Sequence, residues 1–141
     1  MEKGERTLLR AGFLLVLLAL LTGLVVQSFR NPRMGVSAHL EGIMNGLLLV
    51  AAGLAWSHFR LSAGQARTLR GLLLYAAYVN WGTTSLSAAW GTSRLTPIAG
   101  AGFVAQEWQE TIGVVLGVSI AITAVAAVGM MVYALRKEGP K

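Results

Sequence analysis

Four side chains of this sequence are suited to proton transfer or to metal binding: Glu41, Glu107, Glu110 and His39. Glu107 and Glu110 are three residues apart, so they share one face of a helix. Carboxyl groups that share a site with little water keep a proton up to higher pH, which suits them to proton donation near neutrality. We therefore predict a catalytic site that contains Glu41, Glu110, Glu107 and His39.

A polar stripe follows one predicted helix near residues 80–87. Asn80, Thr83 or Thr84, and Ser87 recur at the i, i+3 or i+4, i+7 spacing of a single helical face. Hydrogen bonding between helices is the simpler explanation for Thr83, Thr84 and Ser87. Asn80 lies deepest in its run, and we predict that it contacts a ligand.

Further polar and aromatic residues accompany the acids. Asn45 follows Glu41 by four residues and shares its face. Trp81 is either an aromatic residue of the membrane interface or one wall of a pocket for an aromatic ligand. The predicted substrate-binding residues are Asn45, Asn80, Arg33, Asn31 and Trp81.

Helices must position these side chains, because four uncharged runs dominate the chain: 11–29, 42–59, 71–93 and 111–135. A helix needs about 20 apolar residues to cross a bilayer. The sequence predicts an all-α fold of the integral membrane four-helix bundle type, with transmembrane helices over 8–28, 38–59, 69–90 and 107–135. Residues 1–141 form a single membrane domain, and Pro32 is expected to close the first helix within a loop over 28–37.

Composition excludes several other classes. The chain has 141 residues, of which 55% are hydrophobic and 13% are charged, and it has no Cys. A disordered chain would be more charged and less hydrophobic. Without Cys there is no disulfide scaffold, iron–sulfur cluster, Cys-ligated zinc or thiolate nucleophile. A soluble bundle is disfavoured because helices without a polar face have nowhere to meet water.

The basic residues indicate membrane orientation. Nine Lys or Arg residues lie at the two termini and in the second loop, including Lys137 and Lys141, whereas the other side holds only Arg30, Arg33 and Arg94. The positive-inside rule places both termini in the cytoplasm of a multi-pass protein of the inner membrane. The net charge of +6 thus reports orientation, and we predict no nucleic-acid partner.

Three of the six acidic residues lie at predicted helix starts, on the side of the membrane opposite the termini. Glu41, Glu107 and Glu110 would meet there at one end of the bundle. Helix capping is one alternative, because a Glu in a first turn stabilises the helix dipole by about 0.3–1 kcal/mol. A divalent metal on His39, Glu41, Glu107 and Glu110 is another, although no E-x-x-H or H-E-x-x-H spacing supports it.

Small residues predict close helix packing. Gly42, Gly46 and Gly53 share a helical face with His39, and Gly113 and Gly117 form a G-x-x-x-G step. A chain this small buries little surface in its own core, so these faces predict a homo-oligomer. His39 could be an interfacial hydrogen-bonding residue on that face, or reach the acids if its helix frays.

A resemblance emerges from the segment NPRMGVSAHLEGIMNG over 31–46, which is similar to the signature region of the hydroxylaminobenzene mutase family. The preceding Leu20-Leu21-Thr22-Gly23 fits the family pattern, as do the later positions Tyr75, Asn80, Trp81, Pro97-Ile98 and Gln106-Glu107. The similarity extends from about Leu8 to Arg136. It implies a small integral membrane isomerase that converts hydroxylaminobenzene to 2-aminophenol, in nitroaromatic degradation.

The predicted chemistry agrees with that implication. An acid-promoted Bamberger-type rearrangement needs a proton donor, groups that stabilise a cation, and exclusion of water. We expect Glu41 to donate the proton, Asn45 and Asn80 to orient the N–OH group, and Glu107 and Glu110 to stabilise the cation or relay the proton. Arg33 and His39 would hold the acids in place or assist the proton transfer.

Other functions remain open from the sequence alone. No cofactor is expected for an isomerisation, with a divalent metal as the alternative; the expected partners are the aromatic hydroxylamine and the lipid bilayer. A small proton-coupled transporter of aromatic or cationic compounds also uses four short helices, but it carries a Glu in its first helix, and residues 12–29 have none. An accessory subunit without activity is a third class.

Overall fold

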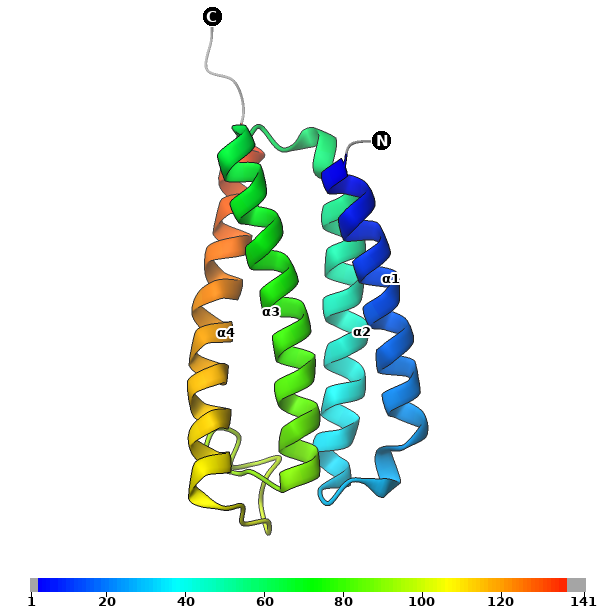
Figure 1. The fold of residues 1–141 in the computed structure, drawn as a ribbon, viewed down its shortest axis with the longest axis vertical. Helices are drawn as coiled ribbons and strands as arrows, with labels where there is room; N and C mark the ends of the chain where they lie inside the picture. Colours follow the sequence, from blue (N-terminus) through cyan, green and yellow to red (C-terminus); the bar gives the residue numbers. More distant parts are fainter. Residues whose placement is uncertain (1–2, 137–141) are drawn as a thin grey trace, which may run out of the picture.

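A computed structural model describes residues 3–136 of the chain. Those residues form helices and no strands (Figure 1). The elements in chain order are α1 (Lys3–Leu24), the 3-10 turn η1 (Val26–Ser28), α2 (Pro32–Leu54), the 3-10 turn η2 (Trp56–His58), α3 (Ala63–Trp90) and α4 (Glu107–Ala134). The predicted all-α class is confirmed. Lys137 and Lys141, which entered the charge prediction, lie outside the described residues.

Three helices, α1, α2 and α3, begin five or six residues before their predicted starts, and local caps account for α2 and α3. Asn31 caps α2: its side-chain Oδ1 accepts the N–H of Met34 at 3.3 Å. Pro32 occupies the first turn, where its missing N–H is no loss. The prediction that Pro32 closes the first helix was therefore wrong, since it opens the second. Ser62 and Gln65 form a reciprocal capping box at the start of α3.

The helices stand side by side in the order α1, α2, α3, α4 (Figure 1). α1 packs along the length of α2, and α3 contacts both α2 and α4. In the part of the chain that the structure describes, α1 and α4 form the two outer members of the bundle and do not pack on each other. The start of α1 and the end of α4 lie at the same end, as an even number of crossings requires.

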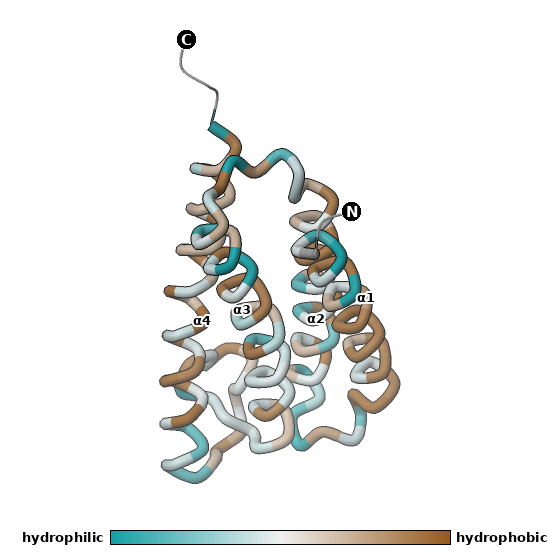
Figure 2. Tube along the Cα trace, turned by 45° about the horizontal axis from the view of Figure 1, so that its top comes forward, coloured by the Kyte–Doolittle hydropathy of each residue, from teal (hydrophilic) through white to brown (hydrophobic). Residues whose placement is uncertain are grey.

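Among the described residues, three helices are long and apolar enough to span a membrane: Gly4–Leu24 of α1, α2 and α4. Figure 2 shows hydrophobic residues along α1 and α4, whereas α3 is paler. α3 runs alongside the others over the same height but falls short in apolar composition, because it carries the polar stripe. Large apolar side chains face outward, as lipid requires; Val125 is 74% exposed and Ile122 is 67% exposed.

The small-residue face of α2 packs within the chain. A Cβ on Gly42 would lie 2.6 Å from the Cβ of Ala19, and one on Gly53 would lie 3.1 Å from the Leu9 side chain. Gly117 of α4 is covered by Leu95 of the long loop that follows α3. These glycines therefore give no support to the predicted homo-oligomer, because their faces are already used by α1 and by the loop.

Gly46→Ala is expected to destabilise the protein by about 1–3 kcal/mol through overpacking. The added Cβ would lie 2.6 Å from Val16 Cγ2 and 2.8 Å from the carbonyl oxygen of Gly12, a backbone atom that cannot move alone. Gly82→Ala in α3 is the matched control, since nothing lies within 4 Å of its Cβ position. Thermal unfolding in detergent measures both, and equal melting temperatures would contradict close α1–α2 packing.

Candidate active site

A cavity of about 140 Å³ lies between α2, α3, α4 and the loop over residues 91–106. Its walls come from all four segments, so the site exists only when the bundle is assembled. The residues that line it are Met34, Ser37 and Glu41 of α2; Asn80, Thr83, Thr84 and Ser87 of α3; Thr92, Leu95, Thr96 and Ala99 of the loop; and Glu110, Gly113, Gly117 and Ile120 of α4.

Glu41 projects into this cavity from well inside α2. It is the tenth residue of the helix that starts at Pro32, about 14 Å along the axis at 1.5 Å per residue. The prediction that Glu41 lies in a first helical turn was therefore wrong, and helix capping does not explain it. Thr84 Oγ1 donates a hydrogen bond of 2.6 Å to Glu41 Oε2. This pair joins α2 to α3 and fixes the carboxyl group at the cavity wall.

The polar stripe of α3 faces the cavity as one unit. Asn80, Thr83, Thr84 and Ser87 all line it, in agreement with their helical spacing. Thr83 is 7% exposed, and its hydroxyl has no hydrogen-bond partner among the described residues. A buried hydroxyl without a partner is unfavourable. Interhelical hydrogen bonding, which we predicted for both residues, explains Thr84 but not Thr83.

Glu110 also lines the cavity, where it holds the loop in place. Its carboxylate accepts the backbone N–H of Ser93 at 2.9 Å and that of Arg94 at 3.0 Å. The Ser93 hydroxyl lies 3.5 Å from the same carboxylate. Glu110 is 6% exposed, so these bonds form out of water. The loop start is thereby anchored to the first turn of α4.

Glu107 lies outside the cavity. Arg94 donates two hydrogen bonds to its carboxylate, at 2.9 and 2.7 Å, and both side chains are well exposed. The hydrogen bonds and negative charge of Glu107 raise the pKa of Arg94 above its usual value. Two of the three predicted acids thus meet at the cavity, and the third forms a surface ion pair. Glu107 shares the first turn of α4 with Glu110 and pairs with one of the arginines at that end of the bundle, but it does not line the cavity.

The long loop closes the cavity at its outer end, and residues before and within the first turn of α2 hold it there. Asn31 is fully buried; its amide Nδ2 donates to the Ala99 carbonyl at 2.9 Å, and its backbone N–H donates to Ala88 at 2.9 Å. Arg33 donates to the carbonyl of Ala101 and lies over the Phe103 ring. Neither Asn31 nor Arg33 lines the cavity. Asn31 and Arg33 therefore position the loop over residues 91–106, which closes the cavity, and they do not face a ligand.

The remaining predicted residues lie elsewhere in the bundle. The ring Nδ1 of His39 is 2.8 Å from the carbonyl oxygen of Ala19, so His39 faces α1. Trp81 Nε1 donates to Thr22 Oγ1 at 3.2 Å and also faces α1. Asn45 is not among the cavity residues, although its amide Nδ2 is buried and lacks a partner among the described residues. The structure does not bring His39 or Trp81 to Glu41.

Within residues 3–136, no three side chains of the His, Cys, Asp or Glu types gather closely enough to hold a metal ion. The alternative metal set of His39, Glu41, Glu107 and Glu110 is therefore not assembled within one chain. His39 faces α1, and Glu107 is paired with Arg94 outside the cavity.

The cavity combines a small volume with polar groups that can exchange protons. A cavity of roughly 150 Å³ in another protein holds one benzene molecule. The present cavity is of that size and adds a carboxyl–hydroxyl pair on one wall. Together with the apolar helices, these features define a membrane protein whose site suits acid–base chemistry on a small molecule.

Comparison with known proteins agrees with this class. Residues 4–136 match the family model described as styrene oxide isomerase, and the chain belongs to that family. It is 36% identical over 132 residues to hydroxylaminobenzene mutase HabB of Ectopseudomonas oleovorans, covering 93% of this chain and 80% of that protein. It is 43% identical over 94 residues to HabA of the same organism, covering 65% and 69% of the two chains.

These matches confirm the resemblance to the hydroxylaminobenzene mutases. They also establish that the chain is an isomerase of a membrane-embedded, helical family. A transporter function is not favoured, since the family and both relatives are named for isomerisation.

Proposed function

We propose that this protein rearranges hydroxylaminobenzene, or a close arylhydroxylamine, to the corresponding 2-aminophenol. The observation that carries the proposal is the cavity of about 140 Å³ with Glu41 and Thr84 in its wall. That volume accepts one substituted benzene ring and little more. The relatives named hydroxylaminobenzene mutase point to the same substrate class.

The reaction is an isomerisation, so it needs no external oxidant or reductant. Protonation of the N–OH oxygen weakens the N–O bond. The bond then breaks, and both of its electrons stay on the oxygen. The positive charge that remains spreads over nitrogen and the ring. The water released from nitrogen then forms a C–O bond at the ortho carbon and gives up one proton, and the proton on that carbon moves to nitrogen to complete the amine. Substrate and product have the same atoms, and the proton returns to the donor.

Each of these steps has a matching group in the cavity. Glu41 is the proton donor and receives the proton back, with Thr84 fixing its orientation. Asn80 and the free hydroxyl of Thr83 hydrogen-bond the N–OH group. The carboxylate of Glu110 stabilises the ring cation from the opposite helix, because negative charge in a water-poor site acts strongly.

Exclusion of water explains the ortho product. Solvent that reached the cation would attack the ring at the para carbon and give 4-aminophenol. The loop over residues 91–106 closes the cavity, and Glu110 and Asn31 both hold it by hydrogen bonds to its backbone. The one water molecule that leaves nitrogen therefore stays beside the ortho carbon.

Purified protein incubated with hydroxylaminobenzene tests the function directly. We expect 2-aminophenol as the main product by liquid chromatography, and formation of 4-aminophenol alone, or no turnover, would overturn the proposal. Elemental analysis of the same preparation, with activity measured before and after chelation, tests for a metal ion that assists the step.

A second candidate substrate comes from the family model. Its description names styrene oxide, a phenyl ring with a strained epoxide whose C–O bond also opens on protonation. The molecule is close to hydroxylaminobenzene in size and would meet the same carboxyl group. Parallel assays with both compounds rank them by kcat/KM, and we expect the hydroxylamine to be preferred because the relatives at 36% and 43% identity are mutases.

We also propose that the protein is a multi-pass protein of the inner membrane with both termini in the cytoplasm. The basic residues gather at the end where α1 begins and α4 ends, and the positive-inside rule makes that end cytoplasmic. Reporter fusions at each terminus test this. Activity of a periplasmic reporter at either terminus would contradict the orientation.

Thr83→Val is expected to raise KM about fivefold to tenfold, the value of one hydrogen bond to substrate. Valine has the same shape but no hydroxyl, and Thr83 Oγ1 has no partner among residues 3–136 that would be lost. The melting temperature should therefore stay the same or rise. Thr84→Val is the matched variant: it removes the bond to Glu41 and should lower kcat. Unchanged KM in Thr83→Val would exclude a contact with substrate.

A further inference from the structure

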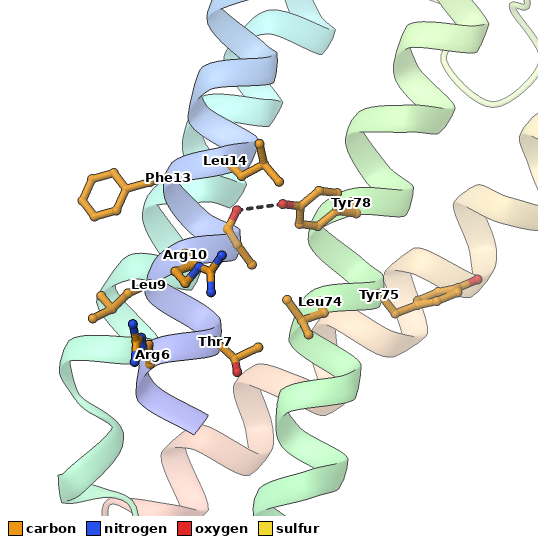
Figure 3. Close-up of a pocket in the computed structure, with 10 residues that line it drawn as sticks. Arg6, Thr7, Leu9, Arg10, Phe13, Leu14, Leu74, Tyr75 and Tyr78 are labelled. Carbon is orange, nitrogen blue, oxygen red and sulfur yellow. Dashed lines mark hydrogen bonds between the residues drawn. The ribbon is translucent and has the colours of Figure 1, made fainter. Parts of the chain in front are cut away.

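A second, larger hollow lies between α1 and α3, at the end where α1 begins (Figure 3). It is an open groove of about 1380 Å³, and it shares none of its lining residues with the cavity that holds Glu41. All its walls come from the two helices α1 and α3. The isomerisation proposed above does not use this groove.

Two arginines supply the charge of the groove. Arg6 and Arg10 are four residues apart and lie on neighbouring turns of α1, both exposed. Within residues 3–136 neither forms an ion pair or a side-chain hydrogen bond. None of the ten residues that line the groove is acidic. The groove therefore presents positive charge that this part of the chain does not neutralise.

The charged part of the groove continues into an apolar part. Phe13 and Leu14 line the groove beyond the arginines and are 62% and 51% exposed, and Leu74 of α3 faces them from the level of Thr7 (Figure 3). Tyr78 reaches across from α3 and donates a hydrogen bond of 2.8 Å to the carbonyl of Ala11 (Figure 3). Leu14 is eight residues beyond Arg6, about 12 Å further into the membrane. From the end of the bundle inward, the groove is thus first charged and then apolar, which is the order of the headgroup and the acyl chain in a lipid.

We propose that this groove binds an anionic phospholipid of the surrounding membrane. Arg6 and Arg10 take the phosphate group, and the first part of an acyl chain lies along Phe13, Leu14 and Leu74. Basic pockets between transmembrane helices recognise anionic headgroups in this way. A zwitterionic lipid fits less well, because the groove offers no carboxylate to its ammonium group. A second copy that placed its own groove against this one would bring like charges together, because no residue that lines the groove is acidic.

Native mass spectrometry of the purified protein in non-ionic detergent tests the proposal. The protein is titrated with phosphatidylglycerol or with phosphatidylcholine of the same acyl chains. We expect tighter binding of phosphatidylglycerol, and an Arg6→Gln/Arg10→Gln variant should bind it roughly 30-fold more weakly. Arg67→Gln is the matched control, because Arg67 is exposed at the same end of the bundle but outside the groove.

A second variant tests the apolar part of the groove separately. Leu14→Trp keeps both arginines and fills the space for the acyl chain, so it should also weaken binding of phosphatidylglycerol, at unchanged helix content by circular dichroism. Equal affinity for the two lipids, an equal loss in Arg67→Gln, or unchanged binding in both groove variants would overturn the proposal. Dissociation of an oligomer in the double variant would overturn it in favour of a second copy.

Discussion

Glu41→Gln is expected to lower kcat about 10²-fold to 10⁴-fold, the usual value of a positioned general acid. Glutamine matches glutamate in shape, and its side-chain oxygen can still accept the hydrogen bond from Thr84. The bundle and the cavity should therefore persist, with KM close to that of the wild type. What is lost is a group that can give a proton to the N–OH oxygen. Initial rates of 2-aminophenol formation by the purified variant measure the effect.

Glu107→Gln is the matched control for this experiment. Glu107 carries the same functional group but lies outside the cavity, paired with Arg94 at the surface. Losing an exposed ion pair costs at most about 1 kcal/mol of stability. We expect activity within about twofold of the wild type, since Glu107 has no contact with the cavity. Wild-type turnover in Glu41→Gln would remove Glu41 from the mechanism, and equal losses in the two variants would restore the grouping predicted from sequence.

Most of the fold could be predicted because membrane burial leaves a strong signal. Uncharged runs near the length of a bilayer crossing identify the helices, and α4 ends within one residue of its predicted boundary at 135. The starts of α2 and α3 were missed because polar caps extend these helices beyond the apolar runs. Asn31 and Ser62 can each cap a helix, but each lies among other residues of loop type.

The site could be predicted only in part, for a different physical reason. Helical spacing placed Asn80 on the same face as Thr83 and Thr84, and all three line the cavity with Glu41. Spacing within one helix says nothing about which neighbour that helix will face. His39 faces α1 through its bond to Ala19, which depends on how α1 and α2 pack. The role of Asn31 in holding the loop depends on where residues 91–106, which lack regular structure, lie in the folded protein.

Glu110→Ala is expected to lower both stability and product selectivity. The carboxylate accepts two backbone N–H groups of the loop, and its removal leaves both part-buried donors without their protein partner. A fully buried unsatisfied donor costs about 1–3 kcal/mol, and because these two are only part-buried we take the lower end for each, a total of about 2 kcal/mol. The loop should loosen, and water should then reach the cation. We therefore expect a larger fraction of 4-aminophenol, measured by chromatography, along with a lower melting temperature.

Ser93→Ala separates the anchoring of the loop from other effects of changing it. It removes only the hydroxyl at 3.5 Å from the carboxylate and keeps the backbone N–H that Glu110 accepts. The product ratio and melting temperature should match the wild type. Glu110→Gln should fall between the two, because one amide oxygen can accept one of the two N–H groups. Suppose that Glu110→Ala lost stability but still gave 2-aminophenol alone. Exclusion of water by the loop would then not be the source of ortho selectivity. The walls formed by α2, α3 and α4 would have to shield the cation instead.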